Sequence, residues 1–321
     1  MIQTMTKHLV WDSSSSIHQM EFQRKPMLSD ISLVIPTLGR PILEQCLYRI
    51  LVSSTWPACL IVVEQGSNTD VVSWLGRVRQ IGIPVKHILS TQRGRSAGIN
   101  RGLEQTRTRF VAITDDDCFV EEGWLCNMAT QLQQHPQSVI TGRVEAAGED
   151  MVVVVTSPTP SIQNRPRLTF DSMSGGNMGA PLDIFRKVGF FDEDPVMATA
   201  EDAEWAYRAL RKGISIRYEP TVVLAHFGWR DPSRRFDQYR DYALSHGGFY
   251  GKYLRRYDLF MLARAASHFG RALRRWVRGT VTGNAELAML GKAYCLNLLP
   301  GIWAGMRSKI KPGKLGNGEG E

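Results

Sequence analysis

The stretch Phe110–Cys118 constrains this chain most, because a short apolar run in it ends in three consecutive carboxylates. Its first four residues have the length and apolarity of a buried strand. Asp115, Asp116 and Asp117 follow, and like charges crowded at a strand end make burial costly. Hard oxygen ligands in such a cluster suit magnesium or manganese. The stretch by itself leaves two interpretations open: a divalent metal site, or a solvated loop with an Asp cap before the helical signal near Glu121.

Strand and helix signals alternate around this stretch. The apolar runs 31–35, 60–63 and 84–89 predict further strands, and segments with helical spacing separate them. Together with the run at 110 they predict an α/β fold with a mostly parallel sheet flanked by helices. Ligands bind beyond the carboxyl ends of the strands in such sheets. Those ends carry polar residues that we expect along one edge: Pro36, Thr37, Glu64, Gln65, Arg93, Arg95 and Asp115–Asp117.

The region after about residue 170 carries a second group of candidate residues. The glycine-rich segment Ser174–Gly179 permits unusual backbone dihedrals. The pattern predicts helices over 181–188 and 200–210, and the second has Glu201 and Asp202 in its first turn. Carboxylates at a helix start also complement the helix dipole and cap free amides, so a purely structural role stays open for both.

Two further strands, over 214–218 and 221–225, precede His226. A single histidine at a strand end is more often a packing residue than a ligand, so its role depends on its neighbours. No Gly-x-Gly-x-x-Gly follows the first strand and no Gly-Lys-Ser/Thr loop occurs. Dinucleotide-binding and P-loop interpretations therefore lose their main support.

Eight motifs between Ile31 and His226 resemble, in their order and spacing, those of family 2 glycosyltransferases of the GT-A fold. Each motif is weak alone, but together they are specific and cover about six-tenths of the chain. The motifs are Val34–Thr37, Val62–Ser67, Gly94–Gly102, Thr114–Asp117, Gly175–Met178, Gly189–Asp192, Glu201–Trp205 and Pro220–His226.

The resemblance implies roles for the two carboxylate groups. The DxD motif of the family maps onto Asp115 and Asp117, which would hold Mn²⁺ or Mg²⁺ against the diphosphate of a nucleotide-sugar. His226 would complete the metal or diphosphate contacts. Asp202 would be the general base that takes the proton from the acceptor hydroxyl, with Glu201 as a supporting or alternative residue.

The resemblance also implies contacts with the nucleotide-sugar. Members commonly have two aspartates where this chain has Glu64-Gln65, and often an arginine where it has Ile99, so the identity of the nucleobase stays open. A UDP-sugar is the expected donor, with dTDP- and GDP-sugars as alternatives. The residues expected at the donor are Pro36, Thr37, Glu64, Arg93, Arg95, Asn100, Asp115, Asp116, Gly176 and Asn177.

Basic residues concentrate in the last third of the chain. Residues 227–321 carry 17 Lys and Arg against 7 Asp and Glu, whereas residues 1–226 carry 22 against 24. This asymmetry argues against a nucleic-acid partner for the first two-thirds. A predicted helix over 259–277 suits the surface of an anionic bilayer, although packing on the catalytic domain is the alternative. It places Leu262, Ala266, Phe269, Leu273 and Trp276 or Val277 on one face, accompanied by Arg264, Arg271, Arg274, Arg275 and Arg278.

We expect no membrane-spanning helix. The segment 234–256 is predicted helical with a break at Gly247-Gly248, and the apolar segment 293–306 is too short to span a bilayer. Five scattered cysteines without a CxxC pair indicate a reducing compartment. The polar N-terminus lacks the apolar core of a signal peptide. We therefore expect a cytoplasmic protein that lies peripherally on the inner face of the plasma membrane.

Three regions are predicted. A flexible tail occupies 1–28, a GT-A catalytic domain 29–228, and a helical basic extension 229–321. The nucleotide-sugar half of the catalytic domain is expected at about 29–120 and the acceptor half at about 121–228.

The resemblance implies an inverting, metal-dependent glycosyltransferase of surface polysaccharide or glycolipid synthesis, with a glycan or lipid-linked acceptor. Two alternatives stay open. A non-catalytic nucleotide-sugar-binding protein of the same fold would have no need of Asp202. A nucleotidyltransferase would normally show a glycine-rich, Lys/Arg-bearing loop after the first strand, and Pro36–Pro41 is a poor version of one.

Overall fold

The computed structural model describes residues 16–147, 155–228 and 232–308. It divides into two compact units, each assembled from separate stretches of the chain. This division differs from the expected domain boundary near 228, because two segments of the expected catalytic domain group with the C-terminal helices. Unit 1 comprises the described residues of Met1–Ile162, Ser174–Ile184 and Arg217–Trp229, and unit 2 those of Gln163–Met173, Phe185–Ile216 and Arg230–Glu321.

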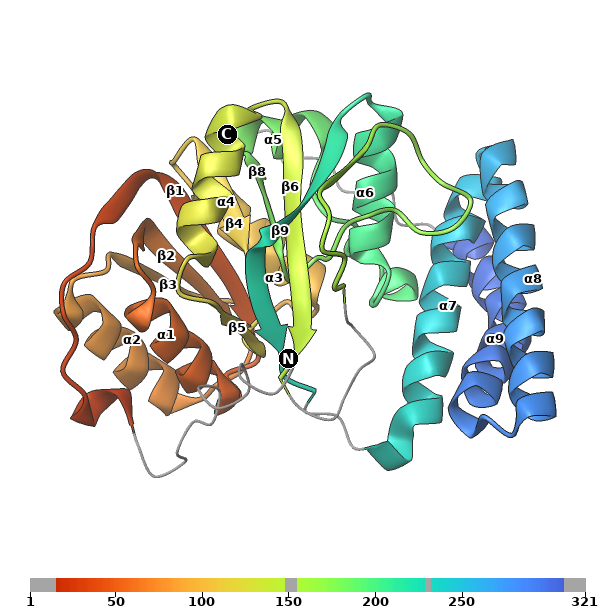
Figure 1. Cartoon of the computed structure of the whole chain (residues 1–321), viewed down its shortest axis with the longest axis horizontal. Helices are drawn as coiled ribbons and strands as arrows, with labels where there is room; N and C mark the ends of the chain where they lie inside the picture. Colours follow the sequence, from red (N-terminus) through yellow and green to blue (C-terminus); the bar gives the residue numbers. More distant parts are fainter. Residues whose placement is uncertain (1–15, 148–154, 229–231, 309–321) are drawn as a thin grey trace. The chain divides into compact units, whose positions relative to one another are not determined.

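Unit 1 is built on a mixed sheet with strand order β3-β2-β1-β4-β8-β6-β9-β5, in which β7 also pairs with β9 (Figure 1). The pairs β1–β2, β1–β4 and β2–β3 are parallel, as predicted, whereas β8 is antiparallel to β4 and β6. The strands are β1 Met27–Thr37, β2 Trp56–Glu64, β3 Val85–Leu89, β4 Phe110–Ile113, β5 Cys118–Val120, β6 Ser138–Ala146, β7 Ser161–Gln163, β8 Met178–Pro181 and β9 Ser215–His226.

Alternating side chains of β1 explain why helices cover both faces of the sheet. Leu33 and Ile35 are buried in a core that includes side chains of α1, α2 and α4. Val34 points to the other face, where a Cβ on Gly102 of α3 would approach its Cγ1 to 2.3 Å. The helices are α1 Ile42–Val52, α2 Thr69–Ile81, α3 Arg95–Gln105, α4 Trp124–Gln134 and α5 Leu182–Val188.

The beginning of the described chain packs on unit 1. Residues 16–28 were expected in a flexible tail, but Ile17 is fully buried. Its N–H donates to Glu44 at 3.1 Å, and Arg77 donates to its carbonyl oxygen at 3.4 Å. The flexible-tail prediction is therefore wrong for this segment, because an apolar anchor and two hydrogen bonds hold it; residues 1–15 lie outside the described chain.

Unit 2 contains the last four helices, of which α7, α8 and α9 pack against one another. Within the described ranges, no helix is both long and apolar enough to cross a membrane. The helices are α6 Glu201–Arg211, α7 Arg235–Leu254, α8 Leu259–Thr282 and α9 Ala285–Arg307.

Three expected element boundaries are wrong. The two strands predicted over 214–218 and 221–225 form the single strand β9. Helix α7 runs unbroken through Gly247-Gly248. The apolar segment 293–306 lies in a longer helix, α9, which continues through Pro300. Gly247-Gly248 does not interrupt α7; instead, the absence of side chains at this pair lets the neighbouring helix α9 pack closely against it.

Glycines bring the backbones of α7 and α9 into direct contact. A Cβ on Gly251 would lie 2.0 Å from the carbonyl oxygen of Ile302, and one on Gly305 would lie 2.1 Å from that of Gly248. Real Cβ atoms do not approach backbone oxygens so closely, so any larger residue would push the helices apart. We refer to this contact as the glycine seam; it consists of Gly247, Gly248, Gly251, Gly301 and Gly305.

Candidate active site

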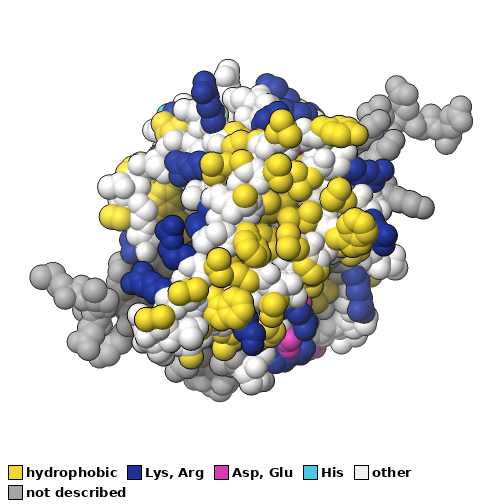
Figure 2. Space-filling model, turned by 90° about the vertical axis from the view of Figure 1, so that its right-hand side faces the viewer, with side chains coloured by type: hydrophobic (Ala, Val, Ile, Leu, Met, Phe, Trp, Pro, Cys, Tyr) yellow, Lys and Arg dark blue, Asp and Glu magenta, His cyan; other side chains and the backbone are white. Residues whose placement is uncertain are grey.

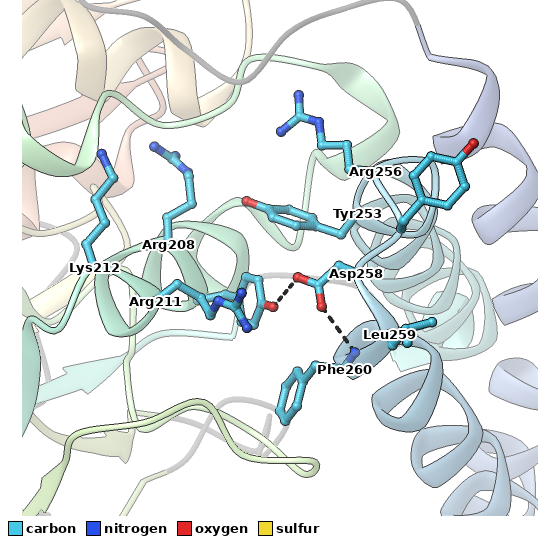
Figure 3. A pocket seen from close by; sticks show the side chains of 10 residues that line it. Arg208, Arg211, Lys212, Tyr253, Arg256, Asp258, Leu259 and Phe260 are labelled. Atoms are coloured by element: carbon cyan, nitrogen blue, oxygen red, sulfur yellow. Dashed lines mark hydrogen bonds between the residues drawn. The ribbon is translucent and has the colours of Figure 1, made fainter.

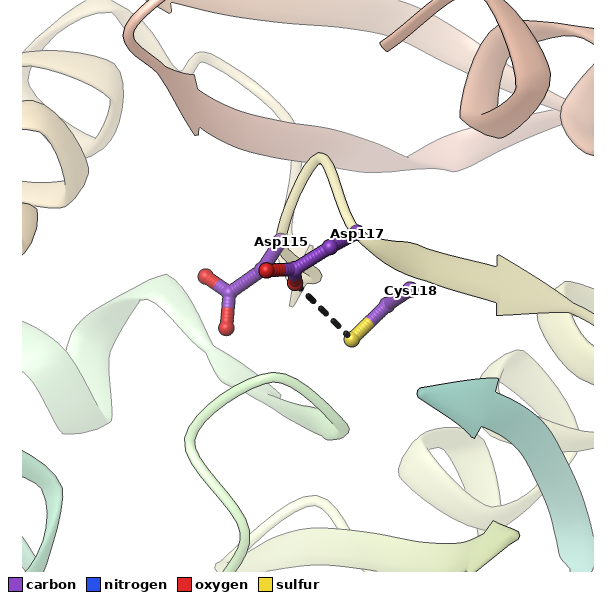
Figure 4. Close-up of side chains that lie close together, drawn as sticks. All are labelled: Asp115, Asp117 and Cys118. Atoms are coloured by element: carbon purple, nitrogen blue, oxygen red, sulfur yellow. Dashed lines mark hydrogen bonds between the residues drawn. The ribbon is translucent and has the colours of Figure 1, made fainter. Parts of the chain in front are cut away.

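The carboxylates after β4 gather where the sequence predicts them. Ligand atoms of Asp115, Asp117 and Cys118 all lie within 4.8 Å of one another (Figure 4). The antiparallel pairing of β5 with β9 sets Cys118 opposite His226. As a result the His226 Nε2 lies 3.8 Å from the Asp117 Oδ1. Four residues from two distant parts of the sequence thus meet at the carboxyl end of β4.

Asp116, the middle carboxylate, has a different environment. It is 3% exposed and accepts a hydrogen bond of 2.6 Å from the Thr37 hydroxyl. Arg40 binds both of its oxygens and also donates to the Asp117 Oδ2 at 3.1 Å. Burial raises the pKa of Asp116, and Arg40 and Thr37 oppose that effect. Asp116 therefore anchors the turn to β1, and its oxygens are occupied by protein partners.

Arg40 was not among the residues predicted for the site. It follows β1 in the segment Pro36–Pro41, which the sequence identifies only as a strand end. Its partners are 76 and 77 positions away, so no local periodicity could reveal the contact. The only available signal was a cation near the end of a strand expected to lie beside the carboxylates.

Asp115 is fixed from two sides. Its Oδ1 accepts from the Arg95 Nε at 2.7 Å. A Cβ added to Gly176 would lie 2.7 Å from its Oδ2 and 3.2 Å from the Cys118 Sγ. Gly176 is therefore a close-contact position beside the carboxylate rather than a flexible spacer. Arg93, also predicted for this site, is exposed near the start of α3.

The donor set suits a divalent cation that prefers oxygen and nitrogen ligands. Asp115 and Asp117 offer carboxylate oxygens, and His226 offers an imidazole nitrogen next to one of them. Burial and the neighbouring carboxylates raise the pKa of the Cys118 thiol well above its usual value. A protonated thiol is a poor ligand, so the carboxylates and the imidazole are the better match for a hard divalent cation.

The predicted donor contact Glu64 and its neighbour Gln65 are already engaged by protein groups. Glu64 is 1% exposed; its Oε2 lies 2.8 Å from the His87 Nε2 and its Oε1 accepts from the Asn68 N–H. Its neighbour Gln65 donates to the carbonyl oxygens of Gln92 and Gly94 at 2.7 and 2.8 Å. Glu64 could reach a nucleobase only if its bonds opened, whereas Gln65 fixes the loop that leads to Arg95.

Asn177 is fully buried and ties three segments of unit 1 together. Its Oδ1 accepts from the Trp124 Nε1 at 2.8 Å, and its Nδ2 donates to the carbonyl oxygens of Arg143 and Val222. These bonds leave the amide little capacity for a ligand. Of the other predicted donor residues, Pro36 and Asn100 are buried in unit 1. For all of these, contact with a nucleotide-sugar stays a prediction.

The predicted catalytic carboxylates lie in unit 2, at the start of α6. Ala200 is the N-cap of this helix and makes no side-chain cap bond. Asp202 is partly exposed, and its Oδ1 accepts from the Ala203 N–H at 2.7 Å. Glu201 is 4% exposed. Asp202 therefore does not occupy the N-cap position, and it keeps solvent access that Glu201 lacks.

Comparison with known proteins finds similarity to glycosyltransferases. Residues 32–186 match the model of glycosyl transferase family 2. The pre-mycofactocin glycosyltransferase of Mycobacterium tuberculosis is 28% identical over 210 residues, which cover 63% of this chain and 43% of that protein. The chondroitin synthase of Pasteurella multocida is 23% identical over 235 residues, which cover 60% and 24%. This chain thus spans less than half the length of these relatives.

Solved structures share the fold at low sequence identity. A mannosyltransferase from Pyrobaculum calidifontis in complex with GDP-Man and Mn²⁺ aligns with a TM-score of 0.61 at 14% identity, covering 91% of this chain and 92% of that one. TarS from S. aureus in complex with UDP-GlcNAc aligns with a TM-score of 0.52 at 12% identity, covering 83% and 90%. These likenesses establish the GT-A fold that the sequence predicted.

Proposed function

We propose a reaction for this chain from the premise that it carries a glycosyl transferase family 2 domain, matched over residues 32–186, and is a glycosyltransferase of the GT-A fold. It transfers a sugar from a nucleotide-sugar to an acceptor hydroxyl and inverts the anomeric configuration. The observation that carries this proposal is the meeting of Asp115, Asp117 and His226 at the carboxyl end of a parallel strand, the edge at which such sheets bind ligands.

The donor half of the reaction uses residues of unit 1. Asp115, Asp117 and His226 would hold Mn²⁺ or Mg²⁺, which when bound offsets the charge on the departing diphosphate. Arg93 is exposed and supplies positive charge near the first turn of α3, whose free amides favour phosphate oxygens. Arg95 supplies a second positive charge there and orients Asp115.

The acceptor half uses Asp202. The acceptor hydroxyl attacks the anomeric carbon from the side opposite the nucleoside diphosphate, and Asp202 takes the hydroxyl proton. The new carbon–oxygen bond forms as the bond to the diphosphate oxygen breaks, and the diphosphate leaves with the electron pair. A single displacement of this kind inverts the configuration. The solvent access of Asp202 supports it as the base over the more buried Glu201.

The donor is a UDP-sugar, with a GDP-sugar as the second candidate, because related folds are known in complex with UDP-GlcNAc and with GDP-Man. The acceptor is a glycan or a lipid-linked glycan, and the product belongs to a surface polysaccharide or glycolipid. A relative named chondroitin synthase supports this assignment, whereas the relative named pre-mycofactocin glycosyltransferase supports only glycosyl transfer.

Attachment to the surface of an anionic membrane is part of the proposal. Helices α8 and α9 contain seven Lys and Arg and one Glu. Large apolar side chains on both helices are exposed and gather on one face of unit 2, with basic residues around them (Figure 2). We call them the apolar stripe; they are Leu259, Leu262, Leu273, Val277, Val281, Leu296, Leu299, Trp303 and Met306.

The apolar stripe refines the predicted membrane face. Arg264, expected among the surface arginines, is 2% exposed and pairs with Asp171 at 2.8 Å, so it is unavailable to lipid. Arg274 and Arg278 are exposed and supply the basic rim. An exposed apolar patch of this kind marks an interaction site, and the excess of arginine favours an anionic bilayer as the partner.

Asp117→Ala tests the metal-binding half of the proposal. The variant should lose turnover and most of its manganese-dependent affinity for UDP, because one hard ligand and its charge are removed. Calorimetry with manganese and with a chelator measures both effects, and exposed Asp70→Ala in the same unit is the control. If Asp117→Ala binds UDP as the parent does, and manganese changes neither affinity, the metal assignment is wrong.

Asp202→Asn tests the acceptor half. The amide keeps the shape of the side chain but cannot take a proton. Turnover should fall by about 10²–10⁴-fold, whereas donor affinity and melting temperature should stay close to those of the parent. A variant that melts earlier but keeps its rate per folded molecule would assign Asp202 a structural role instead.

Vesicle co-sedimentation tests membrane attachment. The parent should bind vesicles that contain anionic lipid, and binding should weaken as salt rises because the attraction of arginines is screened. Replacing Leu262 and Leu273 by Glu should reduce binding, whereas Val72→Glu, at an exposed position of α2, should not. Absence of binding by the parent at low and high salt would end the membrane proposal.

A further inference from the structure

A basic pocket with aromatic walls lies in unit 2. Its residues come from the end of α6 and from the turn that joins α7 to α8 (Figure 3). The cavity has a volume of about 600 Å³ and opens to solvent. Arg211 and the C-cap residue Lys212 line it at the end of α6, and Tyr253, Arg256 and Leu259 line it from the other side. The volume is sufficient for a small phosphorylated group.

The pocket has an excess of positive charge that its own carboxylate does not neutralise. Asp258 accepts hydrogen bonds from the Tyr207 hydroxyl and from the Phe260 N–H, so it serves as the N-cap of α8. Among the described residues, Arg211 and Arg256 form no ion pair with any carboxylate. Lys212 donates to the carbonyl oxygen of Lys187, and it forms no ion pair with a carboxylate in the part of the chain that the structure describes. Three cations thus remain for an anion.

Aromatic rings hold the two arginines at the walls of the pocket. The Arg211 guanidinium carbon lies 5.8 Å from the centre of the Tyr207 ring, and that of Arg256 lies 5.9 Å from the centre of the Tyr253 ring. A guanidinium group that rests on a ring keeps its N–H edge available. Such an edge matches two oxygens of a phosphate group better than an ammonium does.

The turn that lines the pocket contains a residue with an unusual backbone conformation. Tyr257 has a φ of 61° and is 91% exposed. Glycine is the residue normally found in this left-handed conformation at the end of a helix. Leu259, two residues later, lines the pocket and is also the first member of the apolar stripe. Leu259 therefore belongs both to the pocket and to the face proposed to lie on a bilayer.

We propose that this pocket binds the phosphomonoester headgroup of a membrane lipid. Arg211, Lys212 and Arg256 neutralise the two negative charges of the phosphate, and Tyr257 and Leu259 contact the region where the headgroup joins its chains. The inference rests on the membrane attachment proposed above and adds selectivity for one headgroup chemistry. A free phosphate compound offers the same charge without the apolar contact, so the two sources can be separated.

The test compares three vesicle compositions: neutral phosphatidylcholine, and phosphatidylcholine mixed with either phosphatidic acid or phosphatidylserine at the same zeta potential. The parent should bind the phosphatidic acid vesicles about tenfold more tightly than the phosphatidylserine vesicles, because charge-assisted bonds add to the general attraction. Arg211→Gln with Arg256→Gln should abolish this preference. Arg274→Gln with Arg278→Gln removes the same charge from the exposed rim and should weaken binding to both anionic vesicles equally.

Tyr257→Gly separates binding from folding. Glycine adopts the left-handed conformation readily, so the variant should melt no earlier than the parent yet lose part of the preference for phosphatidic acid. Inorganic phosphate identifies the source of the ligand: the lipid assignment requires that millimolar phosphate does not displace the parent from phosphatidic acid vesicles. Displacement by phosphate would instead assign the pocket to a soluble phosphate compound and overturn the proposal.

The outcomes also distinguish this inference from the proposed function. If the parent binds both anionic vesicles equally and the two double variants lose affinity equally, the pocket has no headgroup selectivity although membrane attachment stands. If the parent binds no vesicles, membrane attachment itself fails and the lipid-headgroup inference fails with it. Transfer to a soluble acceptor should be the same for the parent and all of these variants.

Discussion

Gly176→Ala should damage the donor site without unfolding the protein. The added Cβ would lie 2.7 Å from the Asp115 Oδ2, whereas an ordinary contact is at least 3.4 Å, so the carboxylate must move by about 0.7 Å. Asp115 cannot move freely, because its other oxygen is bound to the Arg95 Nε at 2.7 Å. The Cys118 sulfur lies 3.2 Å from the same Cβ, so the Cβ cannot move away from Asp115 toward this sulfur.

The size of the effect follows from this displacement. Misplacing a catalytic group by about 1 Å costs on the order of 10²-fold in rate, so we expect Gly176→Ala to reduce turnover by about that factor. Manganese-dependent affinity for UDP should fall as well. No positive φ is found at Gly176, so alanine fits its backbone and the melting temperature should change little.

Gly76→Ala is the matched control for this experiment. Gly76 lies in α2 of the same unit, and a Cβ there would meet no atom within 4 Å. Alanine in a helix interior should stabilise unit 1 by roughly 0.5–1 kcal/mol and leave turnover unchanged. Calorimetry with UDP, with and without manganese, and a circular-dichroism melt should be run on both variants. If Gly176→Ala keeps the affinity and rate of the parent, the reasoning that a rigid Asp115 holds the metal is refuted.

Two further predictions concern the stability of unit 2. Lys252→Met should destabilise it by about 3–5 kcal/mol in urea unfolding, because Lys252 is 5% exposed and binds Asp192 and Asp194 at 2.7 and 2.9 Å, and the variant would leave both as buried unpaired carboxylates. The control, Lys292→Met at an exposed position, should change stability by less than about 0.5 kcal/mol. Equal effects of the two substitutions would contradict a stabilising role for the buried Lys252 ion pairs. Burial and neighbouring positive charges lower the pKa of His268 to about 2. Below the unfolded pKa of about 6.5, unfolding therefore takes up a proton at this residue. The stabilising contribution should be complete above that pH, and the free energy of unfolding should fall by up to about 1.4 kcal/mol per pH unit as the pH decreases from 6.5 toward 2. His268→Gln should flatten the profile between pH 6.5 and 4, and a profile parallel to that of the parent would show that this histidine is not responsible.

The parts of the site that the sequence predicts are those set by local pattern and strand direction. Asp115 and Asp117 follow an apolar run directly, so their position at the sheet edge needs only the strand assignment. His226 is the last residue of β9, and the antiparallel pairing of β9 with β5 places it opposite Cys118. The alternation of strands and helices likewise predicts the parallel half of the sheet, since a crossover helix is needed between neighbouring parallel strands.

The parts that the sequence does not predict depend on partners far away along the chain. Glu64 is engaged because His87 ends up on the adjacent strand β3, and the sequence alone leaves the pairing order open. Arg40 meets the carboxylates through a turn that carries no periodic signal. The division into units has the same origin: a buried pair between Asp171 and Arg264 links a loop to a helix 93 positions later.

The glycine seam has a consequence for how such a protein diversifies. Because α7 and α9 meet through main-chain atoms, their pairing does not depend on which side chains occupy the outer surface. Positions such as Leu296 and Leu299 are therefore free to change while the helices stay in register. Related chains can acquire a different outer surface by substitution there alone, with no compensating change in the interior. The surface that meets the partner and the contact that holds the helices together can evolve separately.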